Sequence, residues 1–338
     1  MSELMSEFWH PHADNNLIKL RAEVFTKVRQ FMSERNIMEV ETPILSHATV
    51  TEFHLDSFCS TYSSPQLNTP EINTPEINTP KKNTDKTLYL QTSPEYAMKR
   101  LLASGTGAIY QISKVFRNGE QGKHHNPEFT MLEWYQPGYD HHQLMAELES
   151  FLGLFAMGDC EKKSYADVFA RQKGLDPHSC NTDELMGLAE EYGLSSSREE
   201  RPVLLDFIFS HKIAPTLGNT KPLFVYDYPA CQSALAKLSD KSPKVAERFE
   251  LFINGMEIAN GFNELTDADE QLARFEKDLS LRQKAKRPDI PIDYLFMDAL
   301  KHGLPSCAGI AVGIDRLLMA MTGIDDIQEV LTFPIERA

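Results

Sequence analysis

The side chains best suited to chemistry gather in one stretch, Arg117–Tyr135, which reads RNGEQGKHHNPEFTMLEWY. Alternating residues on either side of a polar, glycine-containing turn predict two antiparallel strands, over 108–116 and 128–135. Side chains two apart on a strand share a face, which places these residues together: Phe129, Glu133 and Tyr135. Taken singly, each fits a half-exposed sheet. As a group with Arg117, they predict a binding surface.

A second acidic stretch, Gly255–Leu265 (GMEIANGFNEL), carries two candidate metal ligands, Glu257 and Glu264. Carboxylate oxygens are the ligands that Mg²⁺ prefers. Seven residues apart, the two carboxylates point to opposite faces of a regular strand. We expect them to converge only if a β-bulge breaks the register at Asn260-Gly261. Without a ligand, two such glutamates near a strand end are usually solvated.

The sequence gives no support for disulfide bonds, a zinc site, a Ser–His–Asp triad or a P-loop. The five cysteines form no CxxC pair and no zinc spacing, so we expect reduced thiols. No Ser–His–Asp arrangement stands out. The glycines of 309–316 (GIAVGIDR) do not follow the Walker pattern, which excludes a P-loop. We expect that the adjacent histidines at 124–125 and at 141–142 cannot face one metal ion from a regular element.

The composition describes an ordinary globular chain of 338 residues, 41% hydrophobic and 25% charged, with a formal net charge of −15. That acidity argues against extensive contact with the phosphates of tRNA, so we expect no stable tRNA binding. The N-terminus has no apolar leader, and no stretch approaches the ~18 apolar residues of a membrane-spanning helix. We therefore expect a cytoplasmic protein without membrane contact.

Caps and periodicity predict the elements that hold these side chains. Asp14 predicts the start of a helix that ends near Arg35–Asn36, and a strand follows over 38–45. After a short strand over 88–91, a second helix begins at Thr92 or Ser93 and ends before Gly105. Glu95 lies in its first turn, where the helix dipole favours a carboxylate even without a ligand. The remaining expected elements are helices over 140–157 and 266–286, strands over 221–228, 255–265 and 308–314, and a helix that begins at Asp315–Arg316.

The repeats NTPEI, NTPEI, NTPKK and NTDKT occupy 68–87. Prolines every five residues deny both helix and sheet, and the segment has little to bury. We expect a disordered insertion, over about 62–87, between two strands of one domain that spans residues 1–338. A docking function for the repeat is the alternative.

Three stretches, in order, resemble the three motifs of the class II aminoacyl-tRNA synthetases in their lysyl-tRNA synthetase version. Glu41-Thr42-Pro43 resembles motif 1, FRN and HNPEFTMLE within 116–135 resemble motif 2, and Gly309–Arg316 resembles motif 3. The resemblance covers nearly all of the chain and is thinnest over 60–87 and 160–220. It implies an α+β fold, an antiparallel β-sheet flanked by helices, and a homodimer built on the first helix and strand.

The resemblance also implies a reaction. Such enzymes join a substrate carboxylate to the α-phosphate of ATP, which requires positioning and charge neutralisation but no protein nucleophile. As the catalytic pair, Arg117 would contact the α-phosphate and Arg316 the distal phosphates, because a guanidinium binds phosphate oxygens bidentately. For Arg316 the alternative is a salt bridge with Asp315. The other residues implied for ATP and Mg²⁺ are Asn118, Gly119, Asn126, Phe129 (stacking on adenine), Ile258 and Gly313, with Glu257 and Glu264 for the metal.

A lysine-like substrate needs acidic partners for its two ammonium groups, and the resemblance assigns Glu95, Glu133 and Tyr135. It assigns Asn260 to the substrate carboxylate. The other implied substrate residues are Ser93, Pro94, Glu264 and Ala311, the last standing where lysyl-tRNA synthetases usually have glycine. One departure concerns the turn after Arg117, where Gly119 replaces the glutamate of the family pattern and Glu120 follows it.

The narrower resemblance is to the lysyltransferases of elongation factor P. Motif 1 begins within the first 50 residues, so we expect this chain to lack the anticodon-binding domain that precedes motif 1 in lysyl-tRNA synthetases. HNPEFTMLEW, VAERFELF and EIANGFNELTD also match this family. Its members activate (R)-β-lysine with ATP and transfer it to a lysine ε-amino group of elongation factor P. Two alternatives are a tRNA-charging enzyme that acts with a partner, and a non-catalytic regulator with a synthetase fold.

Overall fold

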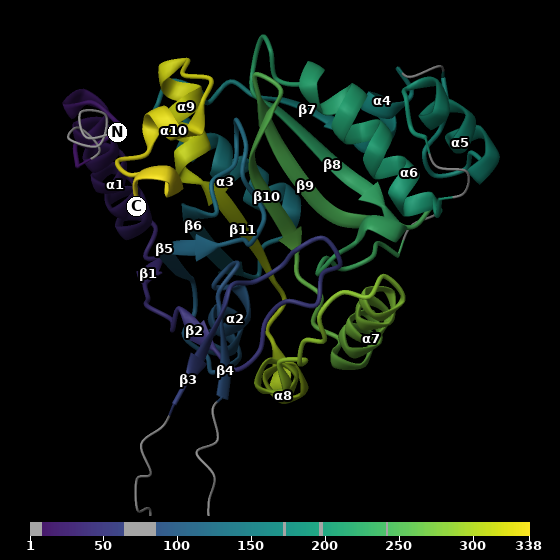
Figure 1. Cartoon of the computed structure of the whole chain (residues 1–338), viewed down its shortest axis with the longest axis horizontal. Coiled ribbons are helices and arrows are strands. Elements are labelled where there is room, and N and C mark those ends of the chain that lie inside the picture. Colours follow the sequence, from purple (N-terminus) through teal and green to yellow (C-terminus); the bar gives the residue numbers. More distant parts are fainter. Residues whose placement is uncertain (1–8, 64–85, 172–173, 196–198, 241–242) are drawn as a thin grey trace, which may run out of the picture.

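An eight-stranded sheet organises the protein, whose computed structural model describes residues 9–63, 86–171, 174–195, 199–240 and 243–338 (Figure 1). Its strands are β1 (Met38–Glu39), β5 (Ile109–Phe116), β6 (Glu128–Pro137), β7 (Glu161–Ser164), β8 (Leu223–Pro229), β9 (Val245–Ile253), β10 (Met256–Asn263) and β11 (Cys307–Gly313). They lie in the order β1-β5-β6-β11-β10-β9-β8-β7. The inner pairings are antiparallel, and the edge pairings β1–β5 and β7–β8 are parallel. The predicted α+β class is confirmed.

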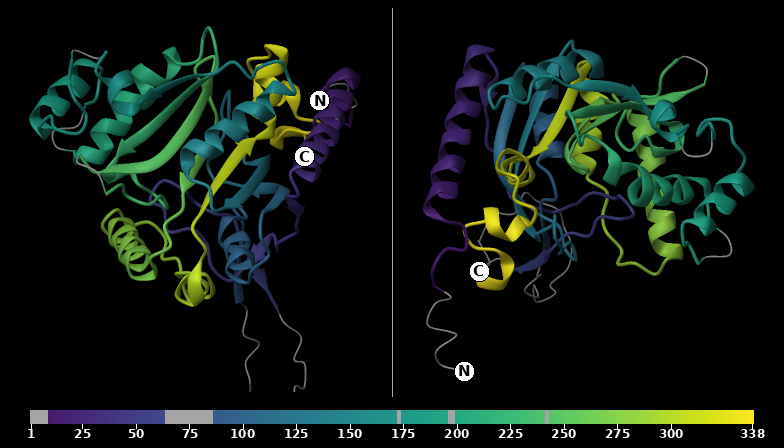
Figure 2. Two further views of the ribbon diagram at one scale, coloured as in Figure 1. Left: turned by 180° about the vertical axis from the view of Figure 1, so that it is seen from behind. Right: turned by 90° about the horizontal axis from the view of Figure 1, so that it is seen from above.

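One face of this sheet is an apolar core covered by α3 (His141–Gly153), which Figure 2 shows lying across the back of the strands. Residues paired across neighbouring strands share a face. One such row, which continues into this core, consists of Tyr110, Trp134, Ile310, Gly261 and Phe249. The α3 side chains buried in the same cluster are Leu144, Met145, Leu148, Phe151 and Leu152. The opposite face is therefore the one left for a binding site.

The other helices surround the sheet. They are α1 (Asn15–Glu34), α2 (Glu95–Ala103), α4 (Tyr165–Phe169), α5 (Thr182–Glu191), α6 (Arg201–Ile208), α7 (Ala268–Lys284), α8 (Tyr294–Gly303), α9 (Ile314–Thr322) and α10 (Ile327–Val330). Figure 1 shows α1 at the β1 edge and α4, α5 and α6 at the β7–β8 edge. The rings of Tyr96 in α2 and Phe296 in α8 stack with their centroids 4.6 Å apart, which ties these two helices together.

A second, small sheet has the order β2-β4-β3, with β2 (Leu45–Ser46), β3 (Cys59–Tyr62) and β4 (Lys86–Leu90). The single strand predicted over 38–45 is wrong: β1 belongs to the large sheet and β2 to the small one. Pro43 lies between them, and a residue without an N–H cannot continue a hydrogen-bonded ladder.

The predicted insertion is flanked by two strands, as expected, since β3 precedes it and β4 follows it. Its predicted bounds are too wide, because Tyr62 and Lys86 pair as the ends of those strands. The expectation of disorder concerns residues 64–85, which lie outside the described residues.

Several elements match their sequence signals. The carboxylate of Asp14 accepts a hydrogen bond from the Leu17 amide at 2.8 Å, which caps α1 as predicted. Helix α3 begins after its Asp140 cap but ends at Gly153, four residues before the predicted end. Strand β9 was not predicted. The helix-and-loop prediction for 159–220 also omitted the short edge strand β7.

The two ends of the described chain meet beside α1. The His12 amide donates to the Thr332 carbonyl at 2.8 Å, and Arg21 of α1 pairs with the buried Asp315 of α9. Asp315 also accepts from the Thr130 amide at 2.7 Å, which fixes α9 against β6. None of the helices described here combines the length and apolarity needed to cross a membrane.

Candidate active site

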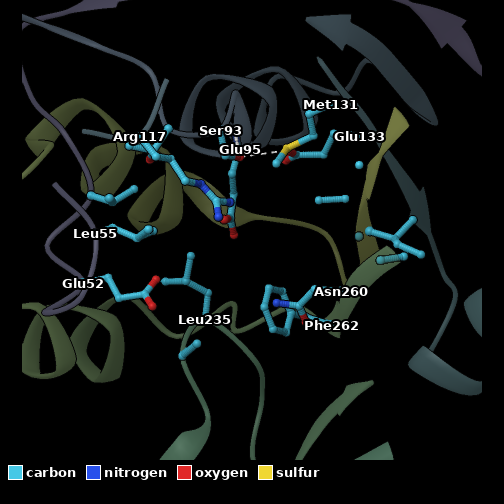
Figure 3. A pocket seen from close by; sticks show the side chains of 18 of the residues that line it. Glu52, Leu55, Ser93, Glu95, Arg117, Met131, Glu133, Leu235, Asn260 and Phe262 are labelled. Atoms are coloured by element: carbon cyan, nitrogen blue, oxygen red, sulfur yellow. Dashed lines mark hydrogen bonds between the residues drawn. The ribbon is translucent and has the colours of Figure 1, made fainter. Parts of the chain in front are cut away.

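The face of the sheet opposite α3 lines a cavity of about 390 Å³ (Figure 3). Two cross-strand rows form its base, and we call their eight residues the cavity floor: Glu133–Ala311–Asn260–Glu250 and Tyr135–Gly309–Phe262–Arg248. All eight line the cavity. The pairing register of β6, β11, β10 and β9 thus assembles residues that are far apart in the sequence.

Most of the residues predicted for the site line this cavity. They are Ser93, Glu95, Arg117, Asn126, Phe129, Glu133, Tyr135, Glu257, Ile258, Asn260, Glu264, Ala311, Gly313 and Arg316. Three predicted residues do not line it: Pro94, Asn118 and Gly119. Pro94 instead caps the start of α2, and the Asn118 amide donates to the Asp56 carbonyl at 2.8 Å.

The turn after Arg117 accounts for the departure from the family pattern. Gly119 has φ +83°, a left-handed conformation in which a glutamate would be strained. The next residue, Glu120, does line the cavity, and its carboxylate lies 3.7 Å from the Arg117 guanidinium. Glu120 thus brings a carboxylate to the cavity one residue after the position where the family pattern has its glutamate.

Two arginines line the cavity, Arg117 from the motif 2 stretch and Arg316 from the motif 3 stretch. The Arg117 guanidinium lies over the Phe129 ring, 5.1 Å from its centroid, and its Nε is buried without a hydrogen-bond partner in the described structure. The Arg316 guanidinium donates to the backbone carbonyls of His124 and Glu257, at 3.1 and 2.9 Å. These bonds orient Arg316 without neutralising it.

The alternative explanation for Arg316, a salt bridge with its neighbour Asp315, does not hold. Asp315 forms its ion pair with Arg21 instead. Arg316 therefore keeps its charge available toward the cavity that it lines.

A cluster of buried carboxylates occupies the part of the cavity near α2. Glu133 accepts from the Ser93 hydroxyl at 2.8 Å and from the Tyr135 hydroxyl at 2.5 Å; Figure 3 shows Ser93, Glu95 and Glu133 converging there. The fully buried Lys99 ammonium lies 2.5 Å from Glu95 and 2.7 Å from Glu264. One Glu264 oxygen has no partner of good hydrogen-bond geometry despite this proximity. Gly309 makes the arrangement possible, since a β-carbon there would collide with the Tyr135 ring and Glu264.

Burial shifts the protonation of this cluster. Burial and the neighbouring Glu95 charge raise the pKa of Glu133 to about 7. Burial also raises the pKa of Glu264 to about 8, against the opposing effect of Lys99. Burial lowers the pKa of Lys99, but Glu264 and Glu95 more than offset it and hold that pKa above its ordinary value. The cluster is therefore poised to ionise fully when cationic groups enter it.

The candidate metal carboxylates do not lie as the sequence suggested. The register of β10 against β9 shifts between Glu257 and Ala259, not at Asn260-Gly261. Asn260 and Gly261 stay in a regular ladder because Gly261 admits the Phe249 ring, which a β-carbon would meet. The predicted position of the bulge is therefore wrong.

Glu257 and Glu264 also differ in their surroundings. Within the described part of the chain, the Glu257 carboxylate has no ion-pair partner, whereas Glu264 faces Lys99. Glu257 acts instead on Glu250: burial, opposed by Arg248 and assisted by the Glu257 charge, raises the pKa of Glu250 to about 7. The structure thus couples Glu257 to Glu250, and Glu264 to the cluster around Lys99.

Sequence reasoning missed several residues that line or support the cavity, among them Arg248, Glu250 and Lys99. Glu250 and Arg248 alternate on β9, and their side chains form an ion pair that also contacts the Tyr228 hydroxyl through Glu250. Lys99 follows Glu95 by one helical turn. The signal for Lys99 was the i, i+4 spacing in α2, but nothing in the sequence indicates that this pair is buried.

One exclusion made from the sequence is also wrong. Ligand atoms of His141, His142 and Asp227 all lie within 4.8 Å of one another. The two histidines occupy the first turn of α3, and Asp227 comes from a different element, β8. None of the three lines the cavity.

Comparison with known proteins agrees with the motifs. The family "tRNA synthetases class II (D, K and N)" matches residues 8–337. A Yersinia enterocolitica protein named "Elongation factor P--(R)-beta-lysine ligase" is 46% identical over 345 residues, covering 100% of both chains. Proteins of the same name from Histophilus somni and Vibrio cholerae are 46% and 45% identical, covering 99% and 98% of this chain and of their own. The chain therefore belongs to the class II tRNA synthetase family, in the group of the elongation factor P--(R)-beta-lysine ligases.

Proposed function

We propose that this protein is an ATP-dependent ligase that activates (R)-β-lysine and transfers it to the ε-amino group of a lysine on elongation factor P. The observation that carries the proposal is the 46% identity to a ligase of that name over the full length of both chains. The cavity supports it with three carboxylates, Glu95, Glu133 and Glu264, beside two cavity-facing arginines.

The reaction has two steps. An oxygen of the lysine carboxylate forms a bond to the α-phosphorus of ATP, and the bond from that phosphorus to the bridging oxygen breaks, releasing pyrophosphate. The acceptor amine then attacks the acyl carbon, AMP leaves, and the amine loses a proton to give the amide. Both steps depend on charge neutralisation and alignment. Arg117 would bind the α-phosphate and Arg316 the distal phosphates.

The adenine end of ATP would lie against Phe129, whose ring is already held beside the Arg117 guanidinium. Asn126 is buried and fixed by a bond from its amide nitrogen to the Glu128 carbonyl. Asn118, Gly119, Ile258 and Gly313 are the further residues that we propose for the nucleotide. For Asn118 and Gly119, which do not line the cavity, contact would come through the turn backbone.

Bound Mg²⁺ would neutralise the phosphate oxygens and hold the leaving pyrophosphate. The donor set fits this ion, because Glu257 lines the cavity and its carboxylate has no ion-pair partner among the described residues. We propose Glu250 as its second carboxylate, since these two groups act on each other electrostatically. Glu264 was predicted from the sequence as a metal ligand. Because it faces Lys99, we propose that it binds an ammonium group of the lysine substrate instead.

The substrate amines would bind among Glu95, Glu133, Glu264 and Tyr135, supported by Ser93 and the turn at Pro94. The Asn260 amide lies on the cavity floor, and its oxygen is buried without a partner among the described residues. We propose that the amide nitrogen of Asn260 donates to the substrate carboxylate, which leaves the oxygen to accept from a donor group. Ala311 lies between Asn260 and Glu133 in the same cross-strand row.

We further propose a cytoplasmic homodimer. Three large apolar side chains near motif 1, Met38, Ile44 and Leu45, are 48%, 43% and 45% exposed in the single chain. Burying them against a second copy would give the dimer that the resemblance implies. The oligomeric state is measured by analytical ultracentrifugation, with Leu45→Glu expected to shift the dimer toward monomer.

Mass spectrometry of elongation factor P tests the function directly. After incubation with the protein, ATP and (R)-β-lysine, one lysine of the acceptor should gain the mass of a β-lysyl group. If the acceptor gains no mass but the protein catalyses lysine-dependent pyrophosphate exchange, the tRNA-charging alternative is favoured. Filter binding of bulk tRNA would then test that alternative. If the protein shows neither transfer to elongation factor P nor pyrophosphate exchange, the alternative of a non-catalytic regulator is favoured.

A further inference from the structure

Two adjacent histidines and an aspartate converge behind the large sheet, on the side of α3 and away from the cavity. The His141 ring nitrogen Nε2 lies 3.3 Å from the Asp227 carboxylate. The rings of His141 and His142 have centroids 4.1 Å apart, and ligand atoms of all three residues fall within 4.8 Å of one another.

Local structure explains the convergence. Asp140 caps α3 through a capping box with Gln143, so the two histidines are the first residues of the helix. Side chains in a first helical turn are not yet confined between neighbouring turns, which lets both imidazoles turn toward one point. This is why the rule for adjacent residues in a regular element fails here.

Asp227 reaches the same point because β8 is irregular there. The register of β8 against β9 shifts between Tyr226 and Tyr228, and Asp227 between them has φ +57°. The Tyr226 ring packs edge-on against His142, 5.3 Å between centroids, which fixes this end of α3 against the strand.

The burial and incomplete hydrogen bonding of His141 are an independent observation that points to a ligand. Its side chain is only 6% exposed, and its Nδ1 has no hydrogen-bond partner among the described residues. A buried imidazole with one nitrogen unpaired loses hydration without compensation.

The donor set is two imidazoles and one carboxylate, which is the chemistry of zinc and related divalent transition metals. Zinc bonds of roughly 2.0–2.2 Å in a tetrahedron place neighbouring ligand atoms about 3.3–3.6 Å apart. The observed distance of 3.3 Å between His141 Nε2 and the Asp227 carboxylate matches that edge. Three protein ligands leave the fourth position for water.

We propose that His141, His142 and Asp227 bind one divalent transition metal ion, with Zn²⁺ as the best fit, which cross-links the start of α3 to β8. Because none of these residues lines the cavity, the site stabilises the back of the sheet and takes no part in the ligase reaction. The proposal is independent of the proposed function.

Isothermal calorimetry with Zn²⁺ on the chelator-treated protein tests this, with Co²⁺ absorption reporting coordination. We expect one equivalent to bind, a visible Co²⁺ band of four-coordinate intensity, and a rise in melting temperature of about 3–6 °C near 100 times Kd. The variants are His142→Ala, whose side chain is exposed, and Asp227→Asn, which keeps a residue type that tolerates positive φ. Each should weaken binding at least tenfold.

Two matched controls make the result specific. His302→Ala removes an exposed histidine of α8 and should leave zinc binding unchanged. Glu257→Gln removes the available carboxylate of the cavity and should also leave it unchanged. If the wild type binds no zinc, or binds it equally well in the His142→Ala and Asp227→Asn variants, the cluster is only a histidine–aspartate hydrogen bond and the proposal is wrong.

Discussion

The ammonium of Lys99 lies 2.7 Å from a Glu264 oxygen and 2.5 Å from Glu95, and the Lys99 side chain has no exposed surface. Three carboxylates, those of Glu95, Glu133 and Glu264, therefore share one internal cation. When all are ionised, this cluster has a net charge of −2 and matches a substrate with two ammonium groups. Without Lys99 these three carboxylates would carry a charge of −3, which would be costly to bury.

Replacing Lys99 with methionine should destabilise the fold. Removing one partner of a buried ion pair leaves uncompensated charge and typically costs about 3–5 kcal/mol. We expect a loss of this order in the free energy of unfolding by urea. The Lys99→Met/Glu264→Gln double variant should recover part of that loss. Lys284→Met, at an exposed position of α7, is the control and should change stability by less than about 0.5 kcal/mol. Equal stability of Lys99→Met and wild type would contradict the charge balance.

Lysine binding should tighten as the pH rises from about 6 to 8.5. Burial raises the pKa values of Glu133 and Glu264 to about 7 and about 8 in the empty cavity, and the ammonium groups of the substrate need both carboxylates ionised. Calorimetric titration across this range measures the slope. Glu264→Gln should bind weakly at every pH and with a shallower slope. A pH-independent affinity in the wild type would show that the carboxylates are already charged.

The same shifts predict the pH dependence of stability without substrate. A carboxylate with a raised pKa binds more protons in the folded than in the unfolded state, so its contribution is present below about pH 4.5 and is lost as the pH rises toward 8. Urea denaturation from pH 5 to 8.5 should show the free energy of unfolding falling over that window. Saturating lysine should flatten the fall. A rise in stability across the window would contradict the assignment.

Arg117→Ala and Arg316→Ala should each reduce pyrophosphate exchange by about 10²–10³-fold while leaving the circular dichroism spectrum unchanged. Losing one group that stabilises developing charge costs about 2.7–4 kcal/mol in the transition state. Arg100→Ala, at an exposed position of α2, is the matched control and should retain full exchange. Exchange within tenfold of wild type in Arg117→Ala would remove Arg117 from the phosphate site.

The resemblance of the three motifs to a known family predicted the fold class and most of the cavity lining, and the hairpin of β5 and β6 was also readable from alternation because it is local in sequence. The partners across the sheet were not predictable in the same way. Glu250 joins the cavity floor only because β9 pairs with β10 in a register with Asn260 opposite Glu250. Burial of Lys99 similarly depends on α8, which lies about 200 residues further along the chain. Contacts between segments that are far apart in the chain, such as α2 with α8, cannot be read from the hydrophobic periodicity of either segment, and neither can the register in which β9 pairs with β10.

Replacing Asn68–Asp85 with a short turn should leave activity and melting temperature nearly unchanged. The composition of the repeat predicts disorder, and loop length changes closure entropy only slowly, by about 0.6 kcal/mol per doubling. Tyr62 and Lys86 are paired at the ends of β3 and β4, so a short connection can join them. Thermal melting and pyrophosphate exchange measure the outcome. A large loss of either would show that the repeat contacts the rest of the protein.

The choice between β-lysine and α-lysine should depend on Ala311. Its position in β11 is opposite Glu133 on one side and Asn260 on the other, so its methyl group shares the cavity floor with both. In the proposed binding mode, Asn260 holds the substrate carboxylate and Glu133 an ammonium group. β-Lysine carries its amino group one carbon further from the carboxylate than α-lysine does. A methyl group between these two anchors therefore occupies space that the backbone of α-lysine would need.

Ala311→Gly should then raise the activation of α-lysine relative to (R)-β-lysine. One methyl group discriminates by about 1–3 kcal/mol, so we expect the ratio of the two pyrophosphate-exchange rates to shift by roughly 5- to 150-fold, with selectivity partial and not absolute. Ala308→Gly is the matched control, since Ala308 belongs to the same strand but is buried in the core on the α3 face. That variant should lose stability and keep the wild-type ratio. If Ala311→Gly also leaves the ratio unchanged, the methyl group only fills space and the selectivity arises at the carboxylates around Lys99.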